Sequence, residues 1–135
     1  MKKIYCIGIG GIGVSALARY YLSRGYEVFG SDKNDSALIE TLKNEGMDII
    51  IGQDEARIDR SFEKVIYSEA VPAHQEELQK AQKLGIPSLK YNLALSEVAN
   101  PHKLIAISGT HGKSTTTSLV SLILKNSGES FYSVI

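Results

Sequence analysis

Short apolar segments alternate with longer amphipathic segments along most of this chain. The strands predicted by this pattern are 3–7, 27–29, 48–51, 64–67, 88–91 and 103–107. The predicted helices are 13–24, 36–45, 74–84, 93–99 and 113–126. Because parallel strands need a crossover connection, and a helix usually provides it, the alternation predicts an α/β fold with a parallel sheet and helices on both faces.

Glycines mark the ends of four of these helices. Gly25, Gly46, Gly85 and Gly128 each follow a predicted helical segment. The residue just after a helix often takes a left-handed backbone conformation, which glycine adopts without steric cost. The glycine positions therefore support the helix ends that the apolar pattern predicts.

The pair Asn100-Pro101 interrupts the alternation after the fifth strand and helix. Proline disfavours helix for the residue before it, so we expect one domain at 1–99 and the start of a second at 100–135. The second region offers one strand, one helix and a short apolar segment, 131–135, that resembles the opening of another strand. Two strands cannot form a stable sheet. We therefore expect this chain to stop inside its second domain.

Charge and cysteine content exclude several classes of protein. The 15 basic and 15 acidic side chains of this 135-residue chain leave no overall field that would attract nucleic acid or an anionic membrane. No run of about 18 apolar residues is present, so no membrane span is expected. A single cysteine, Cys6, cannot form an internal disulfide, and it should be buried in the first strand. These features suit a cytoplasmic protein.

The first predicted strand runs into Gly8-Ile9-Gly10-Gly11-Ile12-Gly13, which satisfies the pattern G-x-G-x-x-G before a helix. In this pattern Gly8 permits a tight turn, Gly10 lets a pyrophosphate approach the backbone, and Gly13 lets the helix pack close to the strand. The loop predicts a Rossmann-like domain that binds a diphosphate.

Ser31 and Asp32 stand at the end of the second predicted strand, and Asp32 lies nineteen residues beyond Gly13. An acidic side chain at this position can accept hydrogen bonds from a ribose hydroxyl. A nicotinamide cofactor, FAD and a UDP-sugar all carry a pyrophosphate, so these residues alone leave the nucleotide open.

A second glycine loop joins the predicted strand 103–107 to the last predicted helix. It reads Gly109-Thr110-His111-Gly112-Lys113-Ser114, a shorter form of the phosphate-binding P-loop, because Ile107 stands where the usual first glycine would be. Free amides at the helix start, the Lys113 ammonium and the Ser114 hydroxyl would bind ATP and a magnesium ion. Thr115 is assigned to the nucleotide, and His111 either lines the γ-phosphate or shapes the loop.

Two phosphate loops indicate an enzyme that binds a nucleotide-linked substrate and consumes a second nucleotide.

In order and spacing, the segments 8–13, 31–32, 67–71 and 109–115 resemble those of the Mur ligases. The resemblance implies a three-domain cytoplasmic enzyme of peptidoglycan synthesis, and the glycine loop is most similar to members that join L-alanine to the lactyl carboxylate of UDP-N-acetylmuramate. In this reaction ATP, with Mg²⁺, converts the carboxylate to an acyl phosphate, and the amine of L-alanine then displaces phosphate.

The resemblance also implies roles for individual residues. The substrate diphosphate would be held by Gly8, Gly10, Gly11, Ile12 and Gly13, and the uridine or sugar end by Ser31, Asp32 and Ser68. ATP would be held by Gly109, Thr110, His111, Gly112, Lys113, Ser114 and Thr115, of which His111, Lys113 and Ser114 would be catalytic and Ser114 would bind the metal. The remaining magnesium ligands and the alanine-binding domain would lie beyond Ile135, so we expect the chain alone not to ligate.

Two alternatives share part of these features. An NAD(P)-binding dehydrogenase or ligand-sensing regulatory module would use the first glycine loop but not the second. A Mur ligase that adds a preformed peptide to the same sugar nucleotide would share nearly all of these residues. The oligomeric state stays open.

Overall fold

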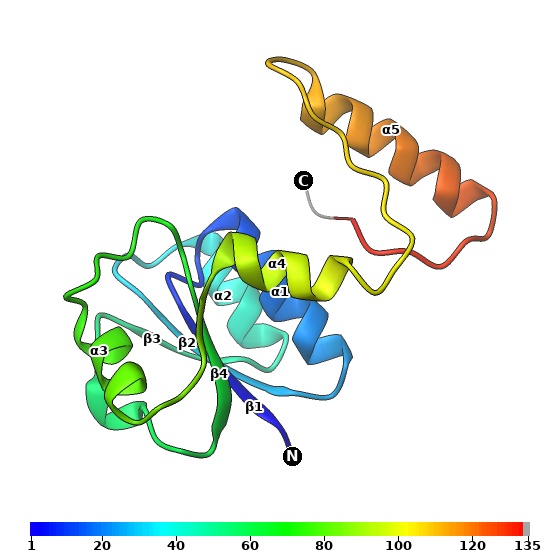
Figure 1. Cartoon of the computed structure of the whole chain (residues 1–135). Helices are drawn as coiled ribbons and strands as arrows, with labels where there is room; N and C mark the ends of the chain where they lie inside the picture. The colour runs from blue at the N-terminus through cyan, green and yellow to red at the C-terminus, as the bar shows by residue number, and fades with distance from the viewer. Residues whose placement is uncertain (134–135) are drawn as a thin grey trace.

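The computed structural model describes residues 1–133, which form one five-stranded parallel sheet and an extended C-terminal arm (Figure 1). The strand order is β3-β2-β1-β4-β5. The strands are β1 (Lys3–Ile7), β2 (Glu27–Asp32), β3 (Asp48–Ile51), β4 (Phe62–Tyr67) and β5 (Ser88–Lys90). The helices are α1 (Ile12–Ser23), α2 (Ala37–Asn44), α3 (Glu76–Lys83), α4 (Tyr91–Ala99) and α5 (Lys113–Asn126), with a short 3₁₀ helix η1 (Glu55–Arg57).

Helices cover both faces of the sheet, as the alternation predicts. On one face, α1, α2 and α4 pack over a core that includes Ile4, Leu17 and Leu42. On the other face, Leu78 of α3 packs in a second core with Tyr5 and Val65 of the sheet. Burial of each large apolar side chain stabilises the fold by about 1.5–3 kcal/mol, so both cores are needed to hold the sheet. The predicted α/β fold is confirmed.

The predicted elements of the first domain are confirmed, with boundaries shifted by a few residues. The glycines after α1, α2, α3 and α5 all have positive φ, between 73° and 101°. The predicted strand 103–107 is wrong, because this segment pairs with no strand in the described part of the chain. An apolar segment becomes a strand only where a neighbouring strand accepts its backbone hydrogen bonds. Of the apolar segment 131–135, residues 131–133 have no regular structure, and 134–135 lie outside the described residues.

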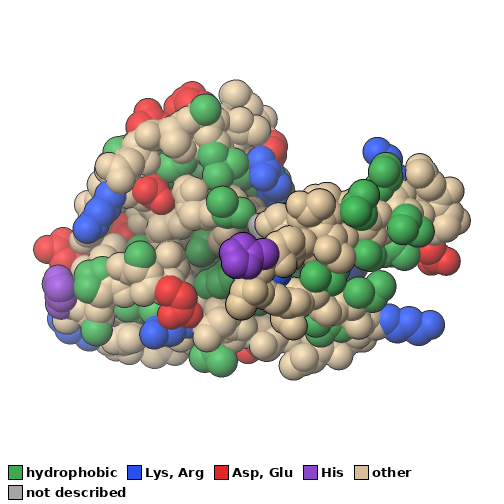
Figure 2. Space-filling view, turned by 90° about the horizontal axis from the view of Figure 1, so that it is seen from above, with side chains coloured by type: hydrophobic (Ala, Val, Ile, Leu, Met, Phe, Trp, Pro, Cys, Tyr) green, Lys and Arg blue, Asp and Glu red, His purple; other side chains and the backbone are tan. Residues whose placement is uncertain are grey.

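The arm that follows residue 100 projects from the domain (Figure 1), and it leaves apolar side chains in solvent (Figure 2). The large exposed ones are Leu104, Ile105, Leu119, Leu122 and Ile123, each between 54% and 66% exposed. The arm returns to the domain through Tyr132, whose ring lies 5.0 Å from that of Tyr20. In residues 1–133, α5 and the other helices lack the length and apolar character needed to cross a membrane.

Cys6 lies fully buried in the central strand β1. Burial raises the pKa of its thiol to about 12. Because the thiolate is the reactive form, we expect the native chain not to react with a thiol-specific reagent at neutral pH, and to react with one equivalent after unfolding in guanidinium chloride. Rapid modification of the native chain would show that β1 is more accessible than the structure indicates.

Candidate functional site

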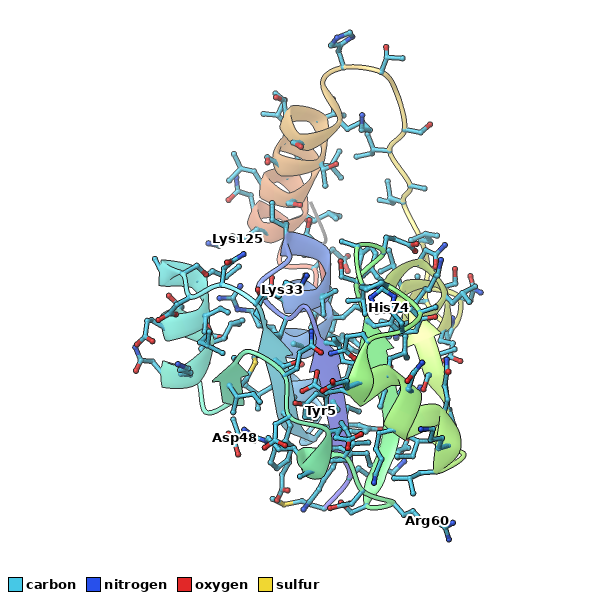
Figure 3. The ribbon with its side chains drawn as sticks, turned by 90° about the vertical axis from the view of Figure 1, so that its left-hand side faces the viewer. Tyr5, Lys33, Asp48, Arg60, His74 and Lys125 are labelled. Carbon is cyan, nitrogen blue, oxygen red and sulfur yellow. The ribbon has the colours of Figure 1, made fainter. Side chains whose placement is uncertain are left out.

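A cavity of about 280 Å³ lies at the carboxyl ends of β1, β2, β3 and β4. The strand order reverses between β1 and β4, and in open parallel sheets this switch point is where ligands bind. Figure 3 shows Lys33 and His74 at this end of the sheet, and Asp48 and Arg60 toward the opposite end. The cavity is lined by Ile7, Gly8, Gly11, Ser31, Asp32, Lys33, Asn34, Gly52, Gln53, Ser68, Ala70, Val71, Pro72 and Gln75.

The first glycine loop borders this cavity, and most of its amides are used internally. Gly8 and Ile9 donate to the carbonyl of Ser31 over 2.8 and 3.1 Å, and Gly11 donates to the carbonyl of Gly8 over 3.1 Å. The Gly10 amide donates to Asp32 Oδ2 over 2.8 Å. The loop is therefore held in shape before any ligand arrives.

The first turn of α1 offers free amides beside the same cavity. Gly11, the N-cap residue of α1, lines the cavity. Within the described residues, the amides of Ile12, Gly13 and Val14 have no hydrogen-bond acceptor. Free amides and the helix dipole make a helix N-terminus a favourable site for an anion. This arrangement can hold a phosphate group.

The structure separates the roles of three glycines in the loop. Gly8 has a φ of +74°, which confirms the predicted tight turn. A Cβ at Gly10 would come within 2.9 Å of Asp32 Oδ2, so Gly10 makes room for that carboxylate. Gly13 was expected to let the helix pack on the strand, and here the structure corrects the expectation. A Cβ at Gly13 would lie 2.5 Å from Tyr91 Cζ, so the close approach is between α1 and α4.

Asp32 ties the glycine loop to the segment after β2. Its Oδ2 accepts from Gly10, and its Oδ1 accepts from the amide of Asn34 over 3.1 Å. Each carboxylate oxygen has a second lone pair, so Asp32 can still accept a hydrogen bond from a ligand. The predicted ribose contact therefore stays a prediction, and the structure adds a loop-holding role.

The other two residues predicted for this site also border the cavity. Ser31 is 1% exposed, and its hydroxyl donates to Glu77 Oε2 over 2.6 Å. Ser68 follows β4, and its Oγ accepts from the amide of Ala70 over 3.3 Å. Sequence reasoning did not select four further polar residues of the lining, Lys33, Asn34, Gln53 and Gln75. Their signal was positional, because the first three follow the ends of β2 and β3 closely and Gln75 is the N-cap of α3.

The second glycine loop lies apart, on the exposed arm. Gly112, with a φ of +79°, is the N-cap of α5, and Lys113 Nζ donates to the carbonyl of Gly109 over 2.6 Å. Within residues 1–133, the amides of Lys113, Ser114 and Thr115 have no acceptor. Thr110 and His111 are exposed. None of the loop residues lines the first cavity, so the structure does not bring the two loops into one site.

Neither a cluster of metal-binding side chains nor the second hollow of the described residues adds to the predicted site. No group of three or more His, Cys, Asp or Glu side chains in residues 1–133 could hold a metal ion. A larger hollow of about 440 Å³ lies near the end of α1, between Tyr20, Tyr21, Lys64 and Glu97. It contains none of the predicted site residues and lies away from the carboxyl edge of the sheet. We therefore place the candidate site in the smaller cavity.

Comparisons with known proteins agree with this fold. The UDP-N-acetylmuramate–L-alanine ligase of Clostridium kluyveri is 45% identical over 90% of this chain, and that of a Sulfurihydrogenibium species is 41% identical over 95%. The chain spans 27% and 28% of the length of these two relatives.

Solved structures of two ligases also superpose closely. The UDP-N-acetylmuramate-alanine ligase of Thermotoga maritima matches 95% of this chain, and the chain covers 30% of it, with a TM-score of 0.87 and 29% identity. The UDP-N-acetylmuramate:L-alanyl-gamma-D-glutamyl-meso-diaminopimelate ligase of Neisseria meningitides matches 95% of this chain, and the chain covers 40% of it, with a TM-score of 0.85 and 30% identity.

A family model places the chain among these proteins. The model described as "Mur ligase family, catalytic domain" matches residues 3–103. That match takes in all five strands of the sheet and every residue of the cavity at its carboxyl edge. With most of its length matched in this way, the chain belongs to the Mur ligase family.

Proposed function

We propose that this chain is the sugar-nucleotide-binding part, with the start of the ATP-binding part, of an enzyme that joins L-alanine to the lactyl carboxylate of UDP-N-acetylmuramate. One observation carries the proposal: a relative named for this reaction is 45% identical over 90% of the chain. The geometry supports it, because a cavity and three free amides lie together at the switch point of the sheet. Such an enzyme serves peptidoglycan synthesis in the cytoplasm.

In this proposal, residues 1–99 bind the sugar nucleotide. The diphosphate lies against the first turn of α1, where Ile12 and Gly13 donate their amides, and Gly8, Gly10 and Gly11 hold the loop open. Ser31, Asp32 and Ser68 border the same cavity and contact the uridine or sugar end. The helix amides at one side of the cavity suit a ligand whose charge is concentrated on its diphosphate.

Residues 100–135 begin the ATP-binding domain in this proposal, and the residues of the second loop fit a triphosphate. Within residues 1–133 the first three amides of α5 have no acceptor, and Gly112 takes the left-handed conformation at the N-cap of this helix. The Lys113 ammonium, which bonds the Gly109 carbonyl in the structure, would turn to a phosphate oxygen. The Ser114 hydroxyl would be one ligand of Mg²⁺, and Thr110, His111 and Thr115 would flank the nucleotide. Bound ATP supplies the phosphoryl group that makes the substrate carboxylate electrophilic.

The exposed apolar face of α5 agrees with a larger domain. Leu119, Leu122 and Ile123 lie in solvent, although large apolar surfaces on a soluble protein normally mark a contact with another part. A ligase also has to bind L-alanine and complete the magnesium site. We therefore expect the chain alone to bind the sugar nucleotide without forming UDP-N-acetylmuramoyl-alanine.

A second candidate is a Mur ligase that adds a preformed peptide to the same sugar nucleotide. It is favoured by the 0.85 TM-score to the peptide-adding ligase of Neisseria meningitides. The 45% and 46% identity to relatives named for L-alanine ligation gives the first candidate stronger support. Both candidates share the site that this chain would provide.

Titration of the chain with UDP-N-acetylmuramate in a calorimeter tests the proposal, with Ile12→Pro as the site variant. Ile12 is the first helical residue of α1 and is 74% exposed, and the extended backbone of Gly11 is compatible with a following proline. Proline removes one free amide without disturbing the helix. A lost hydrogen bond to a charged phosphate should weaken binding roughly tenfold.

Ile12→Ala is the matched control, because it removes the same side chain but keeps the amide. It should bind within about twofold of the wild type, since an exposed side chain contributes little. Tight binding of NADH with no response to UDP-N-acetylmuramate would instead favour the dinucleotide-binding module.

A further inference from the structure

Glu77, on α3, is a fully buried acidic residue that the proposed reaction does not use. Four donors surround its carboxylate. The Tyr5 hydroxyl and the Asp54 amide donate to Oε1 over 2.8 and 3.1 Å. The Ser31 hydroxyl and the Gln75 side-chain amide donate to Oε2 over 2.6 and 2.7 Å. Four hydrogen bonds to two oxygens, two on each, match the acceptor capacity of an ionised carboxylate.

The four donors come from four separate segments of the chain. Tyr5 belongs to β1 and Ser31 to β2, Asp54 follows β3, and Gln75 is the N-cap of α3. Figure 3 labels Tyr5, in the interior of the domain. Because burial and the neighbouring Glu77 raise the pKa of Tyr5, this side chain stays protonated and donates. Glu77 thus joins three consecutive strands to the helix that carries it.

Three of these segments form walls of the candidate site. Ser31 and Gln75 line the cavity, and Asp54 directly follows Gln53, which also lines it. Both polar atoms of the Gln75 side chain are hydrogen-bonded. Its Nε2 donates to Glu77, and its Oε1 accepts from the Leu78 backbone amide over 2.7 Å. Tyr5 is the exception, since it lies in the core beside Phe62 and does not reach the cavity.

We propose that Glu77 is a positioning residue of the sugar-nucleotide site, which holds the ends of β2 and β3 and the start of α3 at the spacing that the ligand requires. This inference rests on the proposed function. A buried carboxylate adds little to the stability of a core, because the free-energy cost of its desolvation offsets much of what its hydrogen bonds contribute. The arrangement is better explained by the three cavity walls that it connects.

Substitution Glu77→Gln tests the inference because an amide cannot satisfy this set of donors. Each carboxylate oxygen accepts from one hydroxyl and one N–H group. A hydroxyl can reverse and accept from the new NH₂ group, but an N–H group cannot. In one orientation the new NH₂ group faces the side-chain NH₂ of Gln75, and in the other it faces the backbone N–H of Asp54. In both cases two donors point at each other. One cavity wall has to move in each case.

The expected result is a roughly tenfold weaker binding of UDP-N-acetylmuramate to Glu77→Gln, measured by calorimetry. Tyr5→Phe is the matched control. It removes one hydrogen bond from the same carboxylate, on the side away from the cavity, so it should lower the melting temperature but leave the affinity within about twofold. If the role of Glu77 were purely structural, the loss of affinity would parallel the loss of melting temperature in both Glu77→Gln and Tyr5→Phe.

Glu77→Asp provides the second variant if Glu77→Gln fails to fold, because it keeps the charge but is one methylene too short to reach all four donors. Wild-type affinity in a folded Glu77→Gln or Glu77→Asp variant would overturn the inference and leave the proposed function intact. Equal losses of affinity in Tyr5→Phe and the Glu77 variant would also overturn it. Failure of the wild type to bind UDP-N-acetylmuramate would overturn the proposed function and the inference together.

Discussion

Substitution Gly30→Ala is expected to lower the free energy of unfolding by about 2–3 kcal/mol, measured by urea denaturation. Gly30 lies in β2, paired with Cys6 of the central strand. A Cβ at this position would stand 2.6 Å from the carbonyl oxygen of Cys6 and 2.9 Å from Cδ1 of Ile9. The carbonyl belongs to the backbone of a strand with neighbours on both sides, so it cannot move without disturbing the sheet.

Gly11→Ala is the control for this prediction. Gly11 has a φ of −70°, which any residue can adopt, and a Cβ there would lie 3.3 Å from the carbonyl oxygen of Gly8. The expected loss is below about 1 kcal/mol, the usual range for exchanging residues at a helix N-cap. If Gly30→Ala and Gly11→Ala lowered the free energy of unfolding equally, the close contact between residue 30 and the Cys6 carbonyl would not be the cause of the loss.

The strands, helices and first glycine loop could be predicted because their signals are local. The apolar pattern of 3–7 followed by Gly8 already requires a strand and a tight turn, and both are present. The segment 103–107 has the same apolar pattern, yet it forms no strand in the described chain. A strand depends on its neighbours, and the sequence of the segment does not contain them.

The internal contacts of the site could not be predicted, because they join residues that are far apart in the sequence. Glu77 stands in the polar run Gln75-Glu76-Glu77, which suggests an exposed helix start, and its burial depends on Tyr5 and Ser31. The double role of Asp32 depends likewise on where the Gly10 amide points. Local patterns therefore indicated the candidate site, whereas the hydrogen bonds that shape it could be seen only in the folded structure.

The contact between Gly13 and Tyr91 gives the second large effect. A Cβ at Gly13 would come within 2.5 Å of Cζ and 2.7 Å of Cε2 of the Tyr91 ring. Tyr91 is the first residue of α4 and packs against the core on that face. Gly13→Ala should therefore push α4 away from α1 and lower the free energy of unfolding by about 2 kcal/mol.

The sign of this effect should reverse once the ring is removed. In a Tyr91→Ala background, Gly13→Ala meets no ring, and alanine is favoured over glycine within a helix by about 0.5–1 kcal/mol. Urea denaturation of the two single variants and the double variant measures the coupling directly. A loss of about 2 kcal/mol in both backgrounds would contradict the assigned contact. A reversal would show that the Tyr91 ring is what excludes a side chain at Gly13, and that this glycine sets how closely α4 approaches α1.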